Sequence, residues 1–361
     1  MKKILTIIGA RPQIIKAAAI SRTIASQFSA LLEEHLLHTG QHYDAAMSQT
    51  FFNELNIPQP HINLNVGSGT HGWQTARMLE GIEQALLHES YDGVLIYGDT
   101  NSTLAGALAA SKLHIPVFHV EAGLRSFNLA MPEEQNRIVA DQLSSRLYAP
   151  TQTAVDNLSR QEELSARTLL TGDIMLDNAL HYTPQALRCG VLERHHLQPD
   201  AYFLATIHRD FNTDNPVRLS NIISGLALAA QTTDILLPLH PRTAARLQSF
   251  HISLPDRVHV IPPASYLEML ALEHHARLVI TDSGGVQKEA YFMHRPSVIL
   301  RPETEWKEIV DHGAATLADA DSQRIADACT TMCRSHLDYP PLFGDGSAAE
   351  NIITDILKYI S

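Results

Sequence analysis

Short runs of β-branched and aliphatic residues alternate with longer segments of helical periodicity along the chain, and this alternation limits the fold more than any other feature. Strands separated by helical crossovers form parallel sheets that helices cover on both faces. We therefore predict an α/β protein with two doubly wound parallel sheets in tandem. The first series of strands is expected at residues 4–8, 36–39, 93–97, 117–120 and 147–149. The second series is expected at residues 168–171, 202–207, 234–239, 258–261, 278–281 and 297–300.

Chain length and linker composition suggest the domain boundaries. A chain of 361 residues exceeds what one hydrophobic core usually supports, so two domains are expected. We predict an N-terminal domain over residues 1–168, a C-terminal domain over 169–345, and a final helical segment over 346–361 that could pack on either domain. Ligands of such domains bind at the carboxyl ends of the strands, so we expect the site in a cleft that the two sheets face.

Composition narrows the choice of partner. The net charge is −12 and the pI is about 5.9, which argues against nucleic acid or an anionic membrane surface as a partner. No apolar run approaches the ~18 residues of a membrane helix, and residues 4–8 predict a strand rather than a signal peptide. The three cysteines make no disulfide framework. We therefore expect a cytoplasmic protein with a small-molecule substrate.

Residues 275–290 carry a phosphate-binding signal, because a buried strand leads into Ser283-Gly284-Gly285 and then into a helix. Unpaired backbone N–H groups at a glycine-rich helix start bind phosphate oxygens, and the helix dipole assists them. Glu289, expected in the first turn, would accept the hydroxyl groups of a ribose or merely complement the dipole. Gly-Gly turns also serve plain packing, so this segment alone does not decide the function.

Other motifs favour neither a dinucleotide nor a metal ion. Residues 67–72 match G-x-G-x-x-G, but no ribose-binding acid follows about 20 residues later, as the full fingerprint requires. His119 and Glu121 resemble half of a zinc deaminase signature, yet no Pro-Cys-x-x-Cys follows. The adjacent histidines at 195–196 and 274–275 point apart on any regular element. We expect no cofactor and no metal.

Charged residues follow the strands of the first series. Arg11 and Lys16 come after the first strand, where cations suit an anionic ligand. Asp99 follows the third strand and is either a catalytic acid or the cap of the next helix. Glu121 follows the fourth strand, and a structural role would require pairing with Arg125, since a buried unpaired carboxylate is costly.

Further acid/base groups complete the predicted site. Glu133 opens a helix beside a proline, a position that also suits a purely structural acid. In the second half, His208-Arg209 and His240-Pro241-Arg242 each follow a strand. A histidine near carboxylates acts as an acid or a base, and an arginine holds a diphosphate, although each pair taken singly also fits a structural role.

These motifs, in this order, resemble the non-hydrolysing UDP-N-acetylglucosamine 2-epimerase family. The matching segments are residues 9–16, 41–42, 98–100, 119–125, 132–137, 206–209 and 281–290. The resemblance implies a GT-B-like fold in which the second domain holds UDP, the sugar faces the first domain, and the C-terminal helix returns to the N-terminal domain. It also implies a homodimer that needs no external cofactor, and a role in polysaccharide biosynthesis such as that of O-antigen.

In that family the reaction removes the proton at C2 and expels UDP from C1. The resulting 2-acetamidoglycal recombines with UDP after protonation from the opposite face. By motif position, the resemblance implies that the catalytic residues are Asp99, Glu121, Glu133 and His208. The residues implied to contact UDP or the sugar are Arg11, Gln13, Lys16, His208, Arg209, His240, Arg242, Ser283, Gly284, Gly285, Glu289 and Arg301.

Some positions depart from the commonest family pattern. Ala10 and Gln13 lie where Gly-Thr-Arg-Pro-Glu is usual, and this pattern, together with residues 240–242 and 301–306, resembles the branch that epimerises UDP-2,3-diacetamido-2,3-dideoxy-glucuronic acid. Phe211 replaces a common glutamate.

A uronate substrate would need an extra cation, which Lys16, Arg125 or Arg242 would supply. The segment at Gln41-His42 only partly matches the activating second site of some bacterial members. The alternatives are a hydrolysing 2-epimerase, a GT-B glycosyltransferase that uses a UDP-sugar, and a UDP-sugar sensor without turnover.

Overall fold

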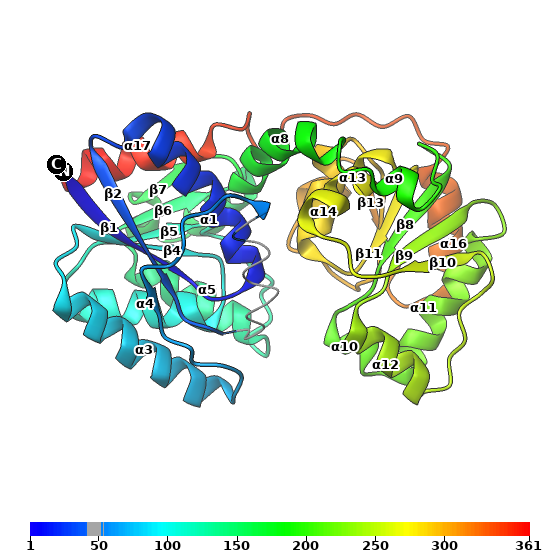
Figure 1. The fold of residues 1–361 in the computed structure, drawn as a ribbon, viewed down its shortest axis with the longest axis horizontal. Helices are drawn as coiled ribbons and strands as arrows, with labels where there is room; N and C mark the ends of the chain where they lie inside the picture. Colours follow the sequence, from blue (N-terminus) through cyan, green and yellow to red (C-terminus); the bar gives the residue numbers. More distant parts are fainter. Residues whose placement is uncertain (42–51, 53) are drawn as a thin grey trace. The chain divides into compact units, whose positions relative to one another are not determined.

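The computed structural model describes residues 1–41, 52 and 54–361, and the chain divides into two compact units (Figure 1). The first unit contains Met1–Leu180 together with Pro341–Ser361, and the second contains His181–Pro340. Each unit is built on one parallel sheet with helical crossovers, so the predicted α/β class with two parallel-sheet domains is confirmed.

The first unit contains a seven-stranded sheet in the order β3-β2-β1-β4-β5-β6-β7. The strand order reverses between β1 and β4, and the carboxyl ends of two such strands flank the usual ligand crevice of an open α/β sheet. The strands are β1 (Lys2–Ile8), β2 (Leu32–His38), β3 (Ile62–Asn63), β4 (Gly93–Tyr97), β5 (Val117–Val120), β6 (Arg146–Ala149) and β7 (Thr168–Leu170).

The second unit contains a six-stranded sheet in the order β10-β9-β8-β11-β12-β13, with its reversal between β8 and β11. The prediction that residues 168–171 form the first strand of this second sheet is wrong, because β7 pairs with β6 in the first sheet. The strands are β8 (Tyr202–Thr206), β9 (Asp234–Pro238), β10 (Val258–Ile261), β11 (Leu278–Thr281), β12 (Ser297–Ile299) and β13 (Ala315–Leu317).

Helices connect the strands in both units. Those of the first unit are α1 (Arg11–Thr23), which continues into the π-helical turn η1 (Ile24–Phe28), α3 (His71–His88), α4 (Asn101–Lys112), α5 (Pro132–Leu143), α6 (Gln152–Leu158), α7 (Glu162–Ser165) and α17 (Ala348–Ile360). The chain passes into the second unit within α8 (Ile174–Ala186). The second unit adds α9 (Val191–Arg194), α10 (Asp210–Thr213), α11 (Pro216–Ala229), α12 (Pro241–Ser249), α13 (Tyr266–His275), α14 (Gly284–Phe292), α15 (Lys307–Asp311) and α16 (Ser322–Met332).

The central strands are buried on both faces, which explains why they appear as continuous apolar runs in the sequence. Every residue of β4 and β8 is buried, as are the last five residues of β1. Several helices start where a side chain satisfies free N–H groups. The Asn215 side chain, for example, caps α11 by accepting hydrogen bonds from the backbone of Val217 and Arg218, with proline at the first helical position.

The C-terminal helix α17 packs on the first unit, where Figure 1 shows it in red. Its Asp355 accepts a hydrogen bond from the Tyr148 hydroxyl at 3.0 Å and lies 3.1 Å from Arg146 Nε, so the helix is tied to β6. At its start, Asp177 of α8 accepts hydrogen bonds from the backbone N–H groups of Ala348 and Ala349 at 3.2 and 2.8 Å. A carboxylate at a helix N-terminus is favoured by the dipole and by the free N–H groups.

Candidate active site

In the first unit, Asp99 lies directly after β4 and forms an ion pair with Arg137 of α5. The Arg137 guanidinium also lies 3.2 Å from Glu134, and Asn136 Nδ2 donates to the Asp99 carbonyl at 2.9 Å. The suggestion that Asp99 caps the following helix is wrong, because Thr100 accepts the capping hydrogen bond. The Asp99 side chain is 29% exposed, so the carboxylate is both paired with a cation and open to a ligand.

Glu121, directly after β5, pairs with Lys16 of α1, and both side chains are only 10% exposed. Arg125, the partner suggested by sequence proximity, instead lies 2.6 Å from Asp141. The reason is the turn after β5, where Glu121 adopts a left-handed φ of 67° and the chain reverses before Arg125. This φ is rare for a non-glycine residue, and such strain clusters at functional sites.

Gly98 makes room for this ion pair. Its φ is 61°, and a Cβ there would lie 3.1 Å from Glu121 Oε2 and 3.4 Å from Lys16 Nζ. Any side chain would therefore crowd the Lys16–Glu121 pair in addition to straining the backbone. The carboxylate of Glu121, after β5, thus lies beside the backbone of the turn that follows β4.

Gln13 holds the first turn together from within. Its Oε1 accepts hydrogen bonds from the backbone N–H groups of Gly9 and Ala10 at 2.9 and 3.2 Å. Its Nε2 donates to the Tyr97 carbonyl at 2.9 Å and to the Thr103 hydroxyl at 3.0 Å. Since the side chain is 1% exposed and its amide is fully engaged, Gln13 joins the turns after β1 and β4. A direct contact with a ligand, as the sequence suggested, is not needed to explain it.

The remaining predicted residues of the first unit lie at helix starts. Arg11 is the exposed first residue of α1, and Glu133 is a half-buried residue in the first turn of α5. The next residue, Glu134, was not predicted. It is 1% exposed and accepts the backbone N–H groups of Ser126 and Phe127 at 2.8 and 3.1 Å, which orders the loop before α5.

In the second unit, His208 follows β8 and its Nδ1 lies 3.2 Å from Asp282 Oδ1. Asp282 is fully buried and also accepts hydrogen bonds from the backbone of His208 and Arg209 and from Asn212 Nδ2. Burial alone would raise the pKa of Asp282, but these donors and His208 hold the pKa below its usual value. An ionised Asp282 orients the imidazole and leaves its Nε2 available.

Asp282, which contacts the candidate residue His208, was not predicted from the sequence. The signal was present, because an aspartate stands at the end of an apolar strand, between Thr281 and Ser283, where burial requires partners. The partners lie at least 70 residues away in sequence, with separations of 74, 73 and 70 residues to His208, Arg209 and Asn212. Only the pairing of β8 with β11 brings them together.

The helix α14 begins as predicted at the glycine pair. Ser283 is its N-cap, and the Ser283 hydroxyl accepts from the backbone N–H of Val286 at 3.4 Å. Glu289 lies in the second turn rather than the expected first turn, and it is 7% exposed. A Cβ at Gly284 would lie 2.5 Å from the Glu305 carboxylate, so the loop after β12 packs directly on the helix start.

The remaining arginines predicted to contact the substrate form ion pairs with acidic side chains. Arg301, which is 7% exposed, lies 2.8 Å from Glu305. Arg242 pairs with Asp210 and Asp214 on the surface, and His240 caps α12 by accepting from the Arg242 backbone at 3.2 Å. These ion pairs link α12 to α10 next to the strand end that carries His208.

No helix among the described residues is both long and apolar enough to cross a membrane, and these residues contain no group of three or more His, Cys, Asp or Glu side chains placed to hold a metal. The predicted motif residue His42 lies outside the described residues, whereas Gln41 Oε1 accepts from the Ser102 hydroxyl at 2.7 Å.

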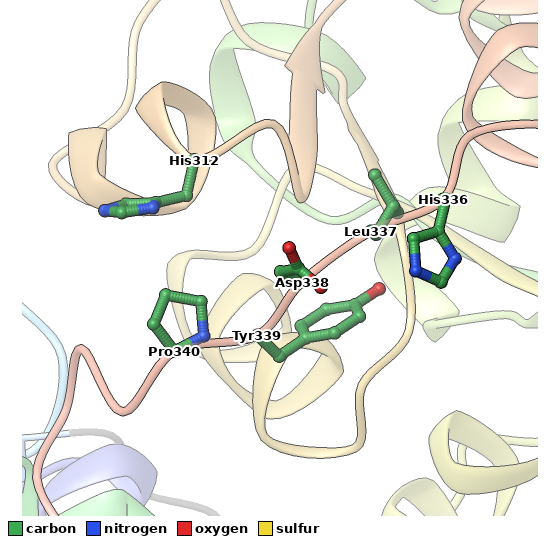
Figure 2. A pocket seen from close by; sticks show the side chains of 6 residues that line it. All are labelled: His312, His336, Leu337, Asp338, Tyr339 and Pro340. Carbon is green, nitrogen blue, oxygen red and sulfur yellow. The ribbon is translucent and has the colours of Figure 1, made fainter.

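A cavity of about 620 Å³ lies elsewhere in the second unit (Figure 2). It is lined by His312 and residues 336–340, and none of the predicted site residues contributes to it.

The sequence is similar to a known family of enzymes over nearly its whole length. The family model described as UDP-N-acetylglucosamine 2-epimerase matches residues 26–358. The chain is 47% identical to the UDP-2,3-diacetamido-2,3-dideoxy-D-glucuronate 2-epimerase of Pseudomonas aeruginosa, covering 99% of both chains. It is 42% identical to the UDP-N-acetylglucosamine 2-epimerase of Methanocaldococcus jannaschii, again covering 99% of both chains.

Solved structures agree with these sequence comparisons. The M. jannaschii enzyme in complex with UDP-GlcNAc and UDP matches with a TM-score of 0.91, 42% identity and 99% coverage of both chains. The UDP-GlcNAc 2-epimerase of Neisseria meningitidis bound to UDP-GlcNAc matches with a TM-score of 0.87 and 27% identity, covering 99% of this chain and 100% of that one. The predicted GT-B-like fold class is thereby confirmed.

Proposed function

Because this chain belongs to the UDP-N-acetylglucosamine 2-epimerase family, an enzyme family that epimerises UDP-sugars at C2, we propose that its substrate is UDP-2,3-diacetamido-2,3-dideoxy-glucuronate. The observation that carries this choice is the 47% identity, over the full length of both chains, to an enzyme named for that substrate. The second candidate substrate is UDP-N-acetylglucosamine, which the 42% identity to the M. jannaschii enzyme supports.

The proposed reaction proceeds by elimination and re-addition. A base takes the C2 proton, the C2–H electron pair forms a C1=C2 double bond, and UDP leaves with the electrons of the C1–O bond. The intermediates are a 2-acetamidoglycal and UDP. Protonation of C2 from the opposite face and return of UDP to C1 give the epimer, so no external oxidant or cofactor takes part.

We assign the proton transfers to the first unit. Asp99 and Glu121 are carboxylates at strand ends, the type of side chain that serves as a base, and each forms an ion pair with a cation. Glu133 lies at a helix start, where the dipole favours an anion. Because C2 is protonated from the opposite face, one of these groups takes the proton and a second group on the other side of the ring supplies the new one.

We assign the leaving group to the second unit. The N–H groups at the start of α14 and the Arg209 guanidinium suit a diphosphate that gains negative charge as the C1–O bond breaks. His208, which Asp282 orients, would protonate or hydrogen-bond that oxygen. Ser283, Gly284 and Gly285 would contribute backbone and hydroxyl donors.

We propose a source for the cation that a uronate substrate would need. Arg125 and Arg242 are both engaged in ion pairs, with Asp141 and with Asp210 and Asp214. Lys16 is paired with Glu121, which we assign to catalysis, so a uronate near Lys16 would share its charge with that carboxylate. All three predicted candidates form ion pairs, and we propose Lys16 as the cation because its partner is a carboxylate that we assign to catalysis.

Proton NMR in D2O tests this proposal. Purified enzyme is incubated separately with UDP-2,3-diacetamido-2,3-dideoxy-glucuronate and with UDP-N-acetylglucosamine, and the C2 proton and anomeric signals are followed. Deuterium at C2 together with a new manno-type anomeric signal is expected for the diacetamido-glucuronate. Conversion of UDP-N-acetylglucosamine alone would replace the proposed substrate with the second candidate.

The same spectra separate the other reactions. Accumulation of UDP and free sugar would indicate a hydrolysing epimerase, and no exchange with either sugar would indicate a glycosyltransferase or a sensor. The Glu121→Gln variant should lose C2 exchange, whereas Glu80→Gln, on the exposed face of α3, should retain it. We also propose that the enzyme is cytoplasmic, which its three free cysteines support. The family resemblance supports a homodimer, and light scattering of the purified protein tests it.

A further inference from the structure

The side chain of His119 in β5 is fully buried between two hydrogen-bond acceptors. Its Nδ1 lies 2.8 Å from Asp141 Oδ1, and its Nε2 lies 2.8 Å from the carbonyl oxygen of Gly98. A carbonyl oxygen only accepts, and an ionised carboxylate only accepts. For both contacts to be hydrogen bonds, each ring nitrogen must carry a proton, so the geometry is that of an imidazolium.

Asp141 supports this protonation state. Burial would raise the pKa of Asp141, but hydrogen bonding and the charges of His119 and Arg125 hold the pKa below its usual value. Its Oδ2 lies 2.6 Å from an Arg125 guanidinium nitrogen and accepts from the backbone N–H of Gly123 at 3.2 Å. One carboxylate thus faces both His119 and Arg125, and no other acidic side chain in the described part of the chain forms an ion pair with either of them.

The three side chains connect the two turns that carry the proposed acid/base residues. His119 reaches Gly98, which immediately precedes Asp99, while Asp141 and Arg125 hold the turn that begins with Glu121. The backbone N–H of Gly98 also donates to the carbonyl of Val120 at 3.0 Å. Both turns contain left-handed residues, and a strained non-glycine backbone such as that of Glu121 persists only where its surroundings fix it.

We propose that His119, as a buried imidazolium held by Asp141, is a positioning residue that fixes the spacing between Asp99 and Glu121. This inference rests on the proposed function, because it concerns the two carboxylates to which that function assigns proton transfer. His119 itself does not touch the substrate. Its role is to keep the Gly98 carbonyl and the Glu121 turn at one separation, on which the geometry of proton transfer depends.

Nitrogen NMR tests the protonation state without any activity. In the full-length wild-type protein with 15N-labelled histidine, His119 should show protons on both Nδ1 and Nε2 at pH 7.5. The Asp141→Asn variant provides the comparison. In Asp141→Asn, where the carboxylate is replaced by an amide, His119 should lose one of these protons. A single protonated nitrogen in the wild type would overturn the proposal.

Kinetics test the positioning role. Glutamine offers an amide that donates to one of the two acceptors and presents an oxygen to the other, so His119→Gln breaks the link on one side. We expect kcat to fall on the order of 100-fold with KM changed less than about 3-fold, since a small displacement of reacting groups lowers the rate without removing binding contacts. His35→Gln is the matched control. His35 lies in β2 of the same sheet and contacts Glu33 and Tyr91 but neither turn.

The outcomes separate this inference from the proposed function. An inactive wild-type enzyme in the C2-exchange assay counts against the function, whereas an active wild type with an unchanged kcat in His119→Gln counts against the positioning role alone. If His119→Gln does not fold, the Asp141→Asn variant and Arg125→Lys, which keeps the charge, provide the same comparison. A loss of kcat in Asp141→Asn, together with the loss of one His119 proton, supports the inference.

Discussion

Gly98 lies at a position of the candidate site where any side chain would crowd Glu121 and Lys16. Its backbone is left-handed, and the Cβ of any other residue at this position would lie 3.1 Å from Glu121 Oε2. Gly313 provides a comparison, because its φ is 76° and nothing would lie within 4 Å of a Cβ there. The two positions separate the backbone effect of an alanine from its effect on the Lys16–Glu121 pair.

We predict that Gly98→Ala and Gly313→Ala lower the free energy of unfolding by similar amounts, about 1–2 kcal/mol each, because both force alanine into the left-handed region. Only Gly98→Ala should also lower kcat, by roughly 10-fold or more, because its methyl group displaces Glu121 or Lys16. Urea denaturation and C2-exchange rates measure the two effects. Equal kcat values in the two variants would show that the pair tolerates the displacement.

Single residues were predictable from the sequence as chemical types but not as partners. Asp99 and Glu121 stood out because carboxylates directly after apolar strands require a reason. Their cations did not, since Arg137 lies 38 residues from Asp99 and Lys16 lies 105 residues from Glu121. The nearer cation, Arg125, is diverted to Asp141 by the left-handed turn, and φ angles of that kind leave no reliable trace at a non-glycine residue.

At the scale of whole elements, predictability followed burial. The strands β1, β4, β8 and β11 were located correctly because they are buried on both faces and therefore continuously apolar. The short edge strands β3 and β13 have two and three residues, which are too few to show a pattern, and they were not predicted. The misplaced β7 is also an edge strand, and only its pairing with β6 shows to which sheet it belongs.

The junction of α8 and α17 contains a carboxyl group with a pH-dependent contribution to stability. Asp177 is 7% exposed, and burial raises its pKa from 3.8 to about 6 despite the hydrogen bonds from Ala348 and Ala349. The folded state therefore binds a proton more readily than the unfolded state between about pH 4 and pH 6. Since stability rises with pH only where the unfolded state binds more protons, this group makes stability fall as pH rises through that window.

We predict that the wild-type protein loses about 3 kcal/mol of stability from Asp177 between pH 4 and pH 6, a value that corresponds to a shift of about two pKa units. Asp177→Asn removes the titrating group and should make the pH dependence correspondingly flatter or more positive. Urea unfolding at several pH values measures the difference. Asp156→Asn, at an exposed position of α6, should leave the wild-type dependence unchanged, and a parallel curve for Asp177→Asn would contradict the assignment.

At the scale of the molecule, the chain visits the first unit twice. It leaves after Leu180 and returns at Pro341, so α17 completes a unit whose sheet was formed by the first half of the sequence. From the residues alone, the final helix could have packed on either half, because an amphipathic pattern shows that a face is buried and not what buries it. The contacts of Asp355 with β6 and of Asp177 with the helix start supply the missing specificity.

The proposed division of labour between the units predicts two different patterns of amide hydrogen exchange. A ligand slows exchange where it stabilises the segments that it contacts. UDP alone should therefore protect residues 206–213 and 281–290 of the second unit. In the Glu121→Gln variant, which should bind without turnover, the complete nucleotide sugar should add protection at residues 98–103 and 119–125 of the first unit.

Mass spectrometry of the exchanged peptides, with the segment 336–340 as a control that should not respond, measures both patterns. That segment lines the cavity of Figure 2 and contains no residue assigned to the substrate. Protection of residues 98–103 and 119–125 by UDP alone, as strong as that produced by the nucleotide sugar, would mean that the first unit binds the diphosphate. The carboxylates would then be facing the leaving group rather than the sugar, and the assignment of proton transfer at C2 to Asp99 and Glu121 would have to be abandoned.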